Sequence, residues 1–176
     1  MDKKGNATST SVLISIYQQY ADGILDGEKI IEFRKSQFPD HVTRVYLYST
    51  SPVKKIVGYF DVEYVLRESP GYLWNRYGKQ GLIGRNDYMK YYSNNDEACG
   101  ILVKSAVRFL RAVEINELDS SMTVPQSFCY LDEEKIERLE KLSSMPMSFN
   151  DSSLFFSAFR RVRSIPRAFK LALGMS

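Results

Sequence analysis

The sequence predicts an α+β fold, in which a small mixed β-barrel carries short peripheral helices and is followed by a helical C-terminal extension. Two observations lead to this class. About five segments show the alternation or the short apolar run of a β-strand, and short segments with helical spacing separate them. No unit recurs at a fixed period, which leaves a small mixed barrel as the expected architecture. A chain of 176 residues can bury one core without disulfide or metal support.

The first part of the barrel is predicted to run strand, helix, tight corner, strand. Residues 12–16 form an apolar run of strand length, and residues 17–26 place apolar side chains at helical spacing. Gly27 stands where a helix ends in the left-handed conformation. Residues 29–35 alternate as the next strand, so Gly27 marks the corner between helix and strand.

Two further strands follow. Residues 44–48 alternate, and Val45 and Leu47 are expected on the buried face. Residues 55–66 form a longer strand, in which Gly58 predicts a bulge at a corner of the barrel. One face of that strand is expected to carry Ile56, Phe60, Val62 and Tyr64.

The remaining elements complete the barrel and extend beyond it. Their predicted ranges are helices at 72–77 and 86–92, a strand at 98–109, a helical turn at 115–118, an extended segment at 125–131 and a helix at 132–142. The chain therefore divides into a flexible arm (1–11), the barrel domain (12–131) and a helical basic extension (132–176). Residues 150–176 alone carry a net charge of +4, which leaves −1 for the rest of a chain whose total is +3.

Composition excludes several classes of function. No apolar run is long enough for a membrane span, and the polar N-terminal residues lack the apolar core of a signal peptide. Cys99 and Cys129 show neither zinc nor CxxC spacing, which favours a cytoplasmic setting. The single histidine, His41, excludes a histidine-rich metal site, and no metal or cofactor is predicted.

The corner after Gly27 gathers three charged residues. On a strand, residues two apart lie roughly 6.6 Å from each other on the same face, so Glu32 and Arg34 share one groove. Lys29 stands at the turn itself, which places two cations around one carboxylate. Two interpretations are open. One is a surface ion pair that contributes ~0–1 kcal/mol, and the other is a polar site for an anionic or hydrogen-bonding ligand.

The spacing Gly27-x-Lys29-x-x-Glu32-x-Arg34 resembles the G-x-K-x-x-E-x-R signature of the ASCH domain, a branch of the PUA-like superfamily. The resemblance covers about residues 12–131, and is strongest to the stand-alone, "predicted transcriptional regulator" type. The segments that follow the family order are 15–16, 45–52, 55–58, 73–74, 88–92 and 125–131.

This resemblance implies a PUA-like barrel that binds RNA or another single-stranded nucleic acid, with a modified base or a nucleoside as a further ligand and a role in regulation. Lys29 and Arg34 would contact phosphate or base acceptors, while Glu32 would orient them or accept a hydrogen bond from a base amino group. Additional candidates for the binding cleft are Ser15, Tyr48, Trp74, Gln126 and Ser127. For Trp74, a core position on its short helix is the competing interpretation.

Two other classes of function stay open. Some small ASCH proteins are amidohydrolases of N4-acetylcytidine that use a lysine and a threonine of the signature. Lys29 matches that lysine, but Glu32 replaces the nucleophilic threonine. Other ASCH proteins are ribonucleases, and here Lys29, Glu32 and a tyrosine would have to serve as acid–base partners. The third class is a protein-interaction module that uses residues 150–176. The sequence does not decide turnover or oligomeric state.

Overall fold

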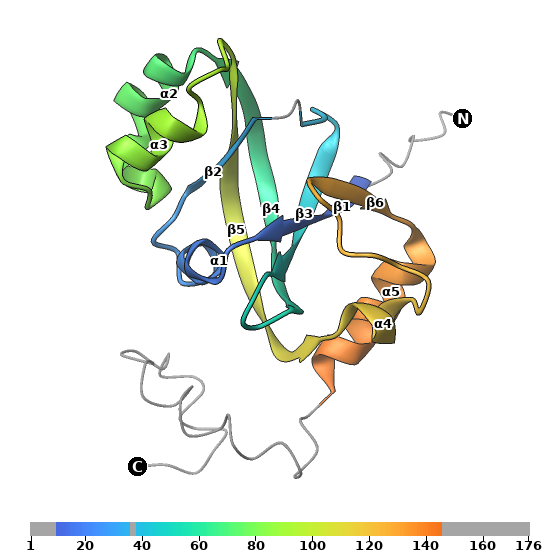
Figure 1. Ribbon diagram of the computed structural model, residues 1–176. Coiled ribbons are helices and arrows are strands. Elements are labelled where there is room, and N and C mark those ends of the chain that lie inside the picture. The colour runs from blue at the N-terminus through green and yellow to red at the C-terminus, as the bar shows by residue number, and fades with distance from the viewer. Residues whose placement is uncertain (1–9, 36–37, 146–176) are drawn as a thin grey trace, which may run out of the picture. The chain divides into compact units, whose positions relative to one another are not determined.

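The computed structural model describes residues 10–35 and 38–145, which form an α+β domain (Figure 1). Its strands are β1 (Thr10–Ile16), β2 (Ile31–Arg34), β3 (Val42–Ser49), β4 (Lys55–Glu68), β5 (Ala98–Val113) and β6 (Phe128–Leu131). Its helices are α1 (Gln18–Leu25), α2 (Pro70–Tyr77), the 3-10 turn η1 (Gly78–Gly81), α3 (Arg85–Tyr91), α4 (Ile115–Leu118) and α5 (Glu133–Ser144). The part of the predicted helical extension after residue 145 and most of the predicted arm lie outside the described residues.

The six strands form one mixed sheet in the order β2-β5-β4-β3-β1-β6. β1 and β3 run parallel, and the other neighbouring pairs are antiparallel. The predicted α+β class and mixed strand pairing are thus confirmed. Within the described ranges no backbone pairing joins β2 to β6, so the closure of a barrel is not shown. Instead, the Arg34 side chain of β2 donates hydrogen bonds to the carbonyls of Ser15 and Ser127, which belong to the other end of the sheet.

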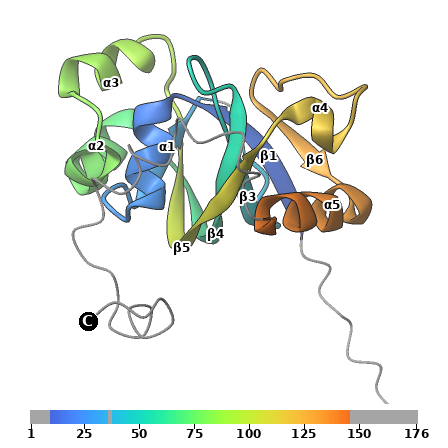
Figure 2. The same cartoon turned by 90° about the horizontal axis from the view of Figure 1, so that it is seen from below.

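Three apolar clusters hold the domain together. The first lies on one face of the sheet and includes Val12, Val45, Phe60 and Ile101. The second packs the other face against α4 and α5, where Leu139 is fully buried. The third joins β2 and β5 to α2 and α3. Figure 2 shows α4 and α5 on one side of the sheet, with α1, α2 and α3 on the other. None of the helices that the structure describes is long and apolar enough to cross a membrane.

β3 is buried on both faces from Val45 onward. Val45 and Leu47 belong to the first cluster as expected, but Tyr46 and Tyr48 belong to the second. Alternation in the sequence would place the tyrosines toward solvent, whereas α4 and α5 cover that face.

β4 departs from the prediction because its register shifts. Ile56 packs in the second cluster, Phe60 in the first, and Tyr64 is 46% exposed, so the expectation that they share one face is wrong. One register shift falls between Ile56 and Gly58, which confirms the predicted bulge. A Cβ at Gly58 would lie 2.3 Å from the carbonyl oxygen of Val107, so only glycine allows this approach of β4 to β5.

Candidate ligand-binding cleft

A cavity of about 670 Å³ opens where β2 approaches the end of β1. Its walls come from the β1–α1 junction, β2, the loop after β3, the segment before β6, and α3 with the residue run that leads into it. These segments lie far apart in the sequence, so the cleft exists only once the sheet is assembled. Its volume is in the range of pockets that hold one small organic ligand.

The corner after α1 delivers Lys29 to the floor of this cleft. Gly27 adopts the predicted positive φ, +78°, and the next two backbone amides, of Glu28 and Lys29, both donate to the carbonyl of Gly23 at 2.9 Å. This tight turn directs the Lys29 side chain inward, where it is only 2% exposed. The sequence pattern therefore predicted the corner at Gly27, and the fold buries the Lys29 side chain that follows it.

The Lys29 ammonium is almost fully occupied by partners within the protein. Its Nζ donates to the Gly81 carbonyl at 2.6 Å, lies 3.3 Å from Oε2 of Glu32, and stands 5.1 Å and 5.4 Å from the ring centres of Tyr20 and Phe33. Burial lowers the pKa of Lys29 below its usual 10.5, and the Glu32 carboxylate opposes this effect. Lys29 is thus better placed to orient Glu32 and to hold Gly81 than to bind a ligand with all three of its protons.

Arg34 connects the cleft to the opposite end of the sheet. Its Nη1 donates to the carbonyl of Ser15 at 3.1 Å, and its Nη2 donates to the carbonyl of Ser127 at 2.7 Å. Nη1 also lies 3.7 Å from Oε1 of Glu32. We call Lys29, Glu32 and Arg34 the buried triad, because their side chains are 2%, 7% and 12% exposed. The triad carries one net positive charge next to the cavity.

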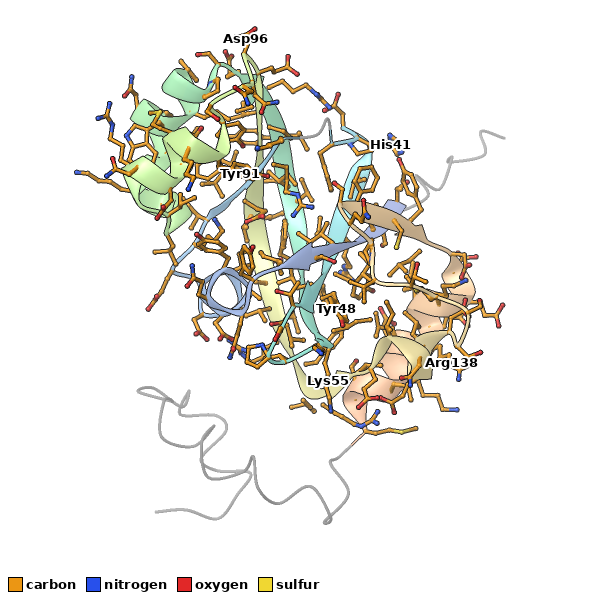
Figure 3. The ribbon with its side chains drawn as sticks, viewed as in Figure 1. His41, Tyr48, Lys55, Tyr91, Asp96 and Arg138 are labelled. Carbon is orange, nitrogen blue, oxygen red and sulfur yellow. The ribbon has the colours of Figure 1, made fainter. Side chains whose placement is uncertain are left out.

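Aromatic rings surround the triad. Tyr17 is 69% exposed at the start of α1, and its ring centre lies 6.3 Å from that of Tyr20. Tyr91 belongs to α3 and lies between that helix and β2 (Figure 3). Its hydroxyl accepts a hydrogen bond from the backbone amide of Lys35 at 3.2 Å, and the ammonium of Lys35 stands 4.7 Å from its ring centre. Burial raises the pKa of Tyr91, so its phenol stays neutral at physiological pH.

The structure brings together most of the residues that the sequence indicated. Ser15, the buried triad and Gln126 all line the cavity. Ser127 stands directly behind it, because its carbonyl accepts from Arg34. The hydroxyl of Ser15 donates to the Pro125 carbonyl at 2.6 Å, so this residue fixes the segment before β6.

Tyr48 and Trp74 lie elsewhere. Tyr48 is 6% exposed and packs in the cluster formed with α4 and α5. Figure 3 shows it near the end of β3, away from Tyr91. Trp74 packs on α2 with its ring centre 5.0 Å from that of Tyr88. Neither residue lines the cavity, and for Trp74 the core position is the one observed.

Sequence reasoning missed the wall that α3 provides. Ile83, Asp87 and Tyr91 face the cavity from this helix and its approach, and Thr50 and Ser51 face it from the loop after β3. No local pattern reveals these positions, because each depends on how a distant segment packs. The sequence shows three tyrosines between residues 88 and 92, but it does not show which of them reaches the cleft. Tyr88 and Tyr92 are buried in the core, and Tyr91 lines the cavity.

The cleft supplies acid–base groups, hydrogen-bond donors and aromatic faces. Among the residues that the structure describes, no cluster of three histidine, cysteine or acidic side chains could hold a metal ion. Two buried hydroxyls close to the cleft, Ser49 Oγ and Thr50 Oγ1, have no hydrogen-bond partner within the described part of the chain. A planar ligand with both polar edges and an apolar face matches this set of groups.

Comparison with known proteins places these features in context. The sequence profile of the ASCH domain matches residues 14–116. An ASCH domain-containing ribonuclease from Zymomonas mobilis is 27% identical over 135 residues, which covers 75% of this chain and 91% of that protein. Large ribosomal subunit protein uL22 from Ureaplasma parvum is 32% identical over 130 residues, and the match spans only 42% of its length. The crystal structure of ASCH from Z. mobilis gives a TM-score of 0.73 at 26% identity, covering 78% of this chain and 98% of that one.

Proposed function

We propose that this chain, which belongs to the ASCH domain family, binds single-stranded RNA in the cleft beside the buried triad. One observation carries the proposal: a single cavity combines a positively charged floor with exposed and half-buried tyrosine rings. Proteins that bind single strands combine cations that neutralise phosphates with aromatic rings on which bases stack. The predicted family is confirmed, but the relatives found give no support to the predicted regulatory subtype, which stays a prediction.

The aromatic rings provide the faces for unpaired bases. Tyr17 and Tyr20 line the cavity from the start of α1, and Tyr91 lines it from α3. Each base stacked on such a ring contributes ~1–3 kcal/mol to binding. A base inside an A-form duplex has both faces covered, so these rings favour an unpaired nucleotide.

The charged groups of the cleft would contact different parts of the RNA. Arg34 lines the cavity with a side chain that is 12% exposed, and Lys35, next to it in the chain, is exposed; these two cations would neutralise phosphates. Glu32, held by Lys29 and Arg34, would accept a hydrogen bond from a base. Lys29 acts through Glu32, since its own side chain is 2% exposed. This differs from the expectation that Lys29 itself meets phosphate, which stays a prediction.

The test is a titration of labelled single-stranded RNA, DNA of the same sequence, and duplex RNA, followed by fluorescence anisotropy at several salt concentrations. We expect the single-stranded RNA to bind most tightly, and its affinity to fall with rising salt because phosphate contacts release counterions. Equal affinity for duplex RNA would contradict the role of the tyrosine rings. Failure of every nucleic acid to bind would reject the proposal.

RNA cleavage at the same cleft is a second candidate, favoured by the relative named as a ribonuclease. In such a reaction the ribose 2′-oxygen attacks the adjacent phosphorus and the 5′-oxygen leaves, so one group accepts a proton and another donates one. Glu32 would accept the 2′-hydroxyl proton in this reaction. Tyr91, whose phenol is neutral, is a candidate donor to the leaving 5′-oxygen.

Cleavage is tested with an end-labelled RNA and a copy that carries a single 2′-deoxy nucleotide. We expect a break at each susceptible ribose, the loss of that break where the 2′-hydroxyl is missing, and no cleavage by Glu32→Gln. Circular dichroism of the variant confirms that it folds. Cleavage that persists in Glu32→Gln would remove Glu32 from the reaction, and cleavage at the deoxy position would exclude attack by the 2′-oxygen.

A further inference from the structure

One acidic side chain in the cleft has no counter-charge. Asp87 lines the cavity from the first turn of α3 and is exposed. Within the described ranges it makes no hydrogen bond and no ion pair with another side chain. Glu32, the other carboxylate of the cavity, differs sharply because it has both Lys29 and Arg34 beside it. The two acids therefore act differently on a ligand.

An unpaired carboxylate is unfavourable next to RNA phosphates. Like charges brought together at an interface raise the free energy of the complex, so the phosphate chain is expected to pass on the side of Arg34 and Lys35. What a carboxylate attracts is an N–H donor. Bases differ in this respect, because cytosine and adenine present exocyclic amino groups where uracil presents a carbonyl oxygen.

The position of Asp87 on α3 relates it to a stacking surface. Asp87 and Tyr91 are four residues apart on the helix, so they occupy the same face one turn from each other. Both residues line the cavity, so this shared face of α3 is open to a ligand bound there. A base stacked on the free face of the Tyr91 ring would present its edge toward Asp87.

We propose that Asp87 determines base specificity, by accepting a hydrogen bond from the exocyclic amino group of a base stacked on Tyr91. The cleft then prefers cytosine to uracil at this position. This inference rests on the proposed binding of single-stranded RNA and adds the class of base that the site selects. Asp87 is a specificity residue here and takes no part in bond breaking.

The experiment compares oligocytidylate with oligouridylate of the same length, about eight nucleotides, which falls within the usual site size of single-strand binders. The full chain is titrated with each labelled RNA by fluorescence anisotropy at neutral pH. Wild-type protein should bind the cytidine oligomer roughly tenfold more tightly, the discrimination typical of a good base contact. Asp87→Asn should bring the ratio of the two affinities close to one, because an amide both accepts from cytosine and donates to uracil.

Asp96→Asn is the matched control. Asp96 is exposed, does not line the cavity, and lies at the upper edge of the molecule in Figure 3, apart from Tyr91. The Asp96→Asn substitution removes the same charge as Asp87→Asn and should leave the ratio of the affinities for oligocytidylate and oligouridylate unchanged. A wild-type ratio near one would overturn the inference, as would an unchanged ratio in Asp87→Asn or an equal change in both variants. If neither oligomer binds the wild-type chain, the proposed function itself fails.

Discussion

Two clusters of charged side chains lie on different parts of the sheet and use similar chemistry. The buried triad lies at the cleft, whereas Arg44, Asp61 and Glu140, which we call the surface network, lie where β3 and β4 meet α5. Arg34 faces one carboxylate and Arg44 faces two. In each cluster a cation also stands over a tyrosine ring: Lys29 is 5.1 Å from the ring centre of Tyr20 and Arg44 is 4.0 Å from that of Tyr59.

The clusters differ in burial and in the partners they hold. Side chains of the surface network are 27%, 32% and 55% exposed, against 2%, 7% and 12% in the triad. Arg44 bonds to side chains, while Lys29 and Arg34 also bond to backbone carbonyls from distant segments. Transferring charges into a buried site carries a large desolvation penalty, which exposed pairs avoid. The triad therefore fixes the backbone around the cleft, and the surface network only adds to a packed interface.

Among the variants that test this difference, Lys29→Met is expected to lower the free energy of unfolding most. The variant leaves the Gly81 carbonyl without its donor and leaves Glu32 with Arg34 alone. Breaking a buried pair by removing one partner costs ~3–5 kcal/mol, and we expect the lower end because Arg34 remains. Urea unfolding followed by circular dichroism measures the loss.

Lys79→Met is the control for that variant, because Lys79 is exposed in η1 and its side chain makes no hydrogen bond or ion pair within the described part of the chain. It should change the free energy of unfolding by less than ~0.5 kcal/mol. A loss of the same small size in Lys29→Met would show that the triad behaves like the surface network.

The next largest effect is expected on RNA affinity, with the free energy of unfolding unchanged. Tyr17→Ala removes a ring that is 69% exposed, so the free energy of unfolding should stay within ~0.5 kcal/mol of the wild type. Affinity for single-stranded RNA should fall by ~1–3 kcal/mol through the lost stacking. Tyr72→Ala is the matched variant, because Tyr72 is 53% exposed on α2 and does not line the cavity. Equal losses of RNA affinity in the two variants would argue against the cleft as the binding site.

These contrasts also show what the sequence could predict. The corner at Gly27 and the grouping of Lys29, Glu32 and Arg34 were predictable, since they depend on neighbours within eight residues. The burial of that group was not, because its cover comes from Gly81, Ser15 and Ser127. The faces of β4 were predicted wrongly where register shifts break the two-residue alternation. The α3 wall of the cleft was missed because only tertiary packing places it.

A smaller effect is expected at the surface network. Arg44→Met removes the 2.8 Å ion pair to Asp61 and the contact with the Tyr59 ring. Partly exposed pairs contribute ~0–1 kcal/mol, so the free energy of unfolding should fall by about 1 kcal/mol at most. RNA affinity should not change, because Arg44 lies on the face covered by α5. A loss as large as that of Lys29→Met, in the same urea experiment, would remove the distinction between the clusters.

The smallest and most diagnostic effect is the dependence of these losses on pH. Burial lowers the pKa of Lys29 in the folded protein below the 10.5 of the unfolded chain. Between the two values the unfolded chain binds more protons, so the free energy of unfolding rises with pH in that window. Lys29→Met lacks this rise, and its deficit relative to wild type should grow as the pH increases toward 10.5.

Arg44→Met provides the comparison, because a guanidinium stays protonated throughout this range and its deficit should stay flat. Tyr88, whose pKa burial raises to about 12, destabilises the folded state above pH 10 in every variant and cancels in the differences. A Lys29→Met deficit that stays flat up to about pH 10 and shrinks only above it would mean that attraction to Glu32 outweighs burial at Lys29. Lys29 would then stay protonated throughout this pH range. That result would favour direct contact between Lys29 and phosphate over a role in orienting Glu32.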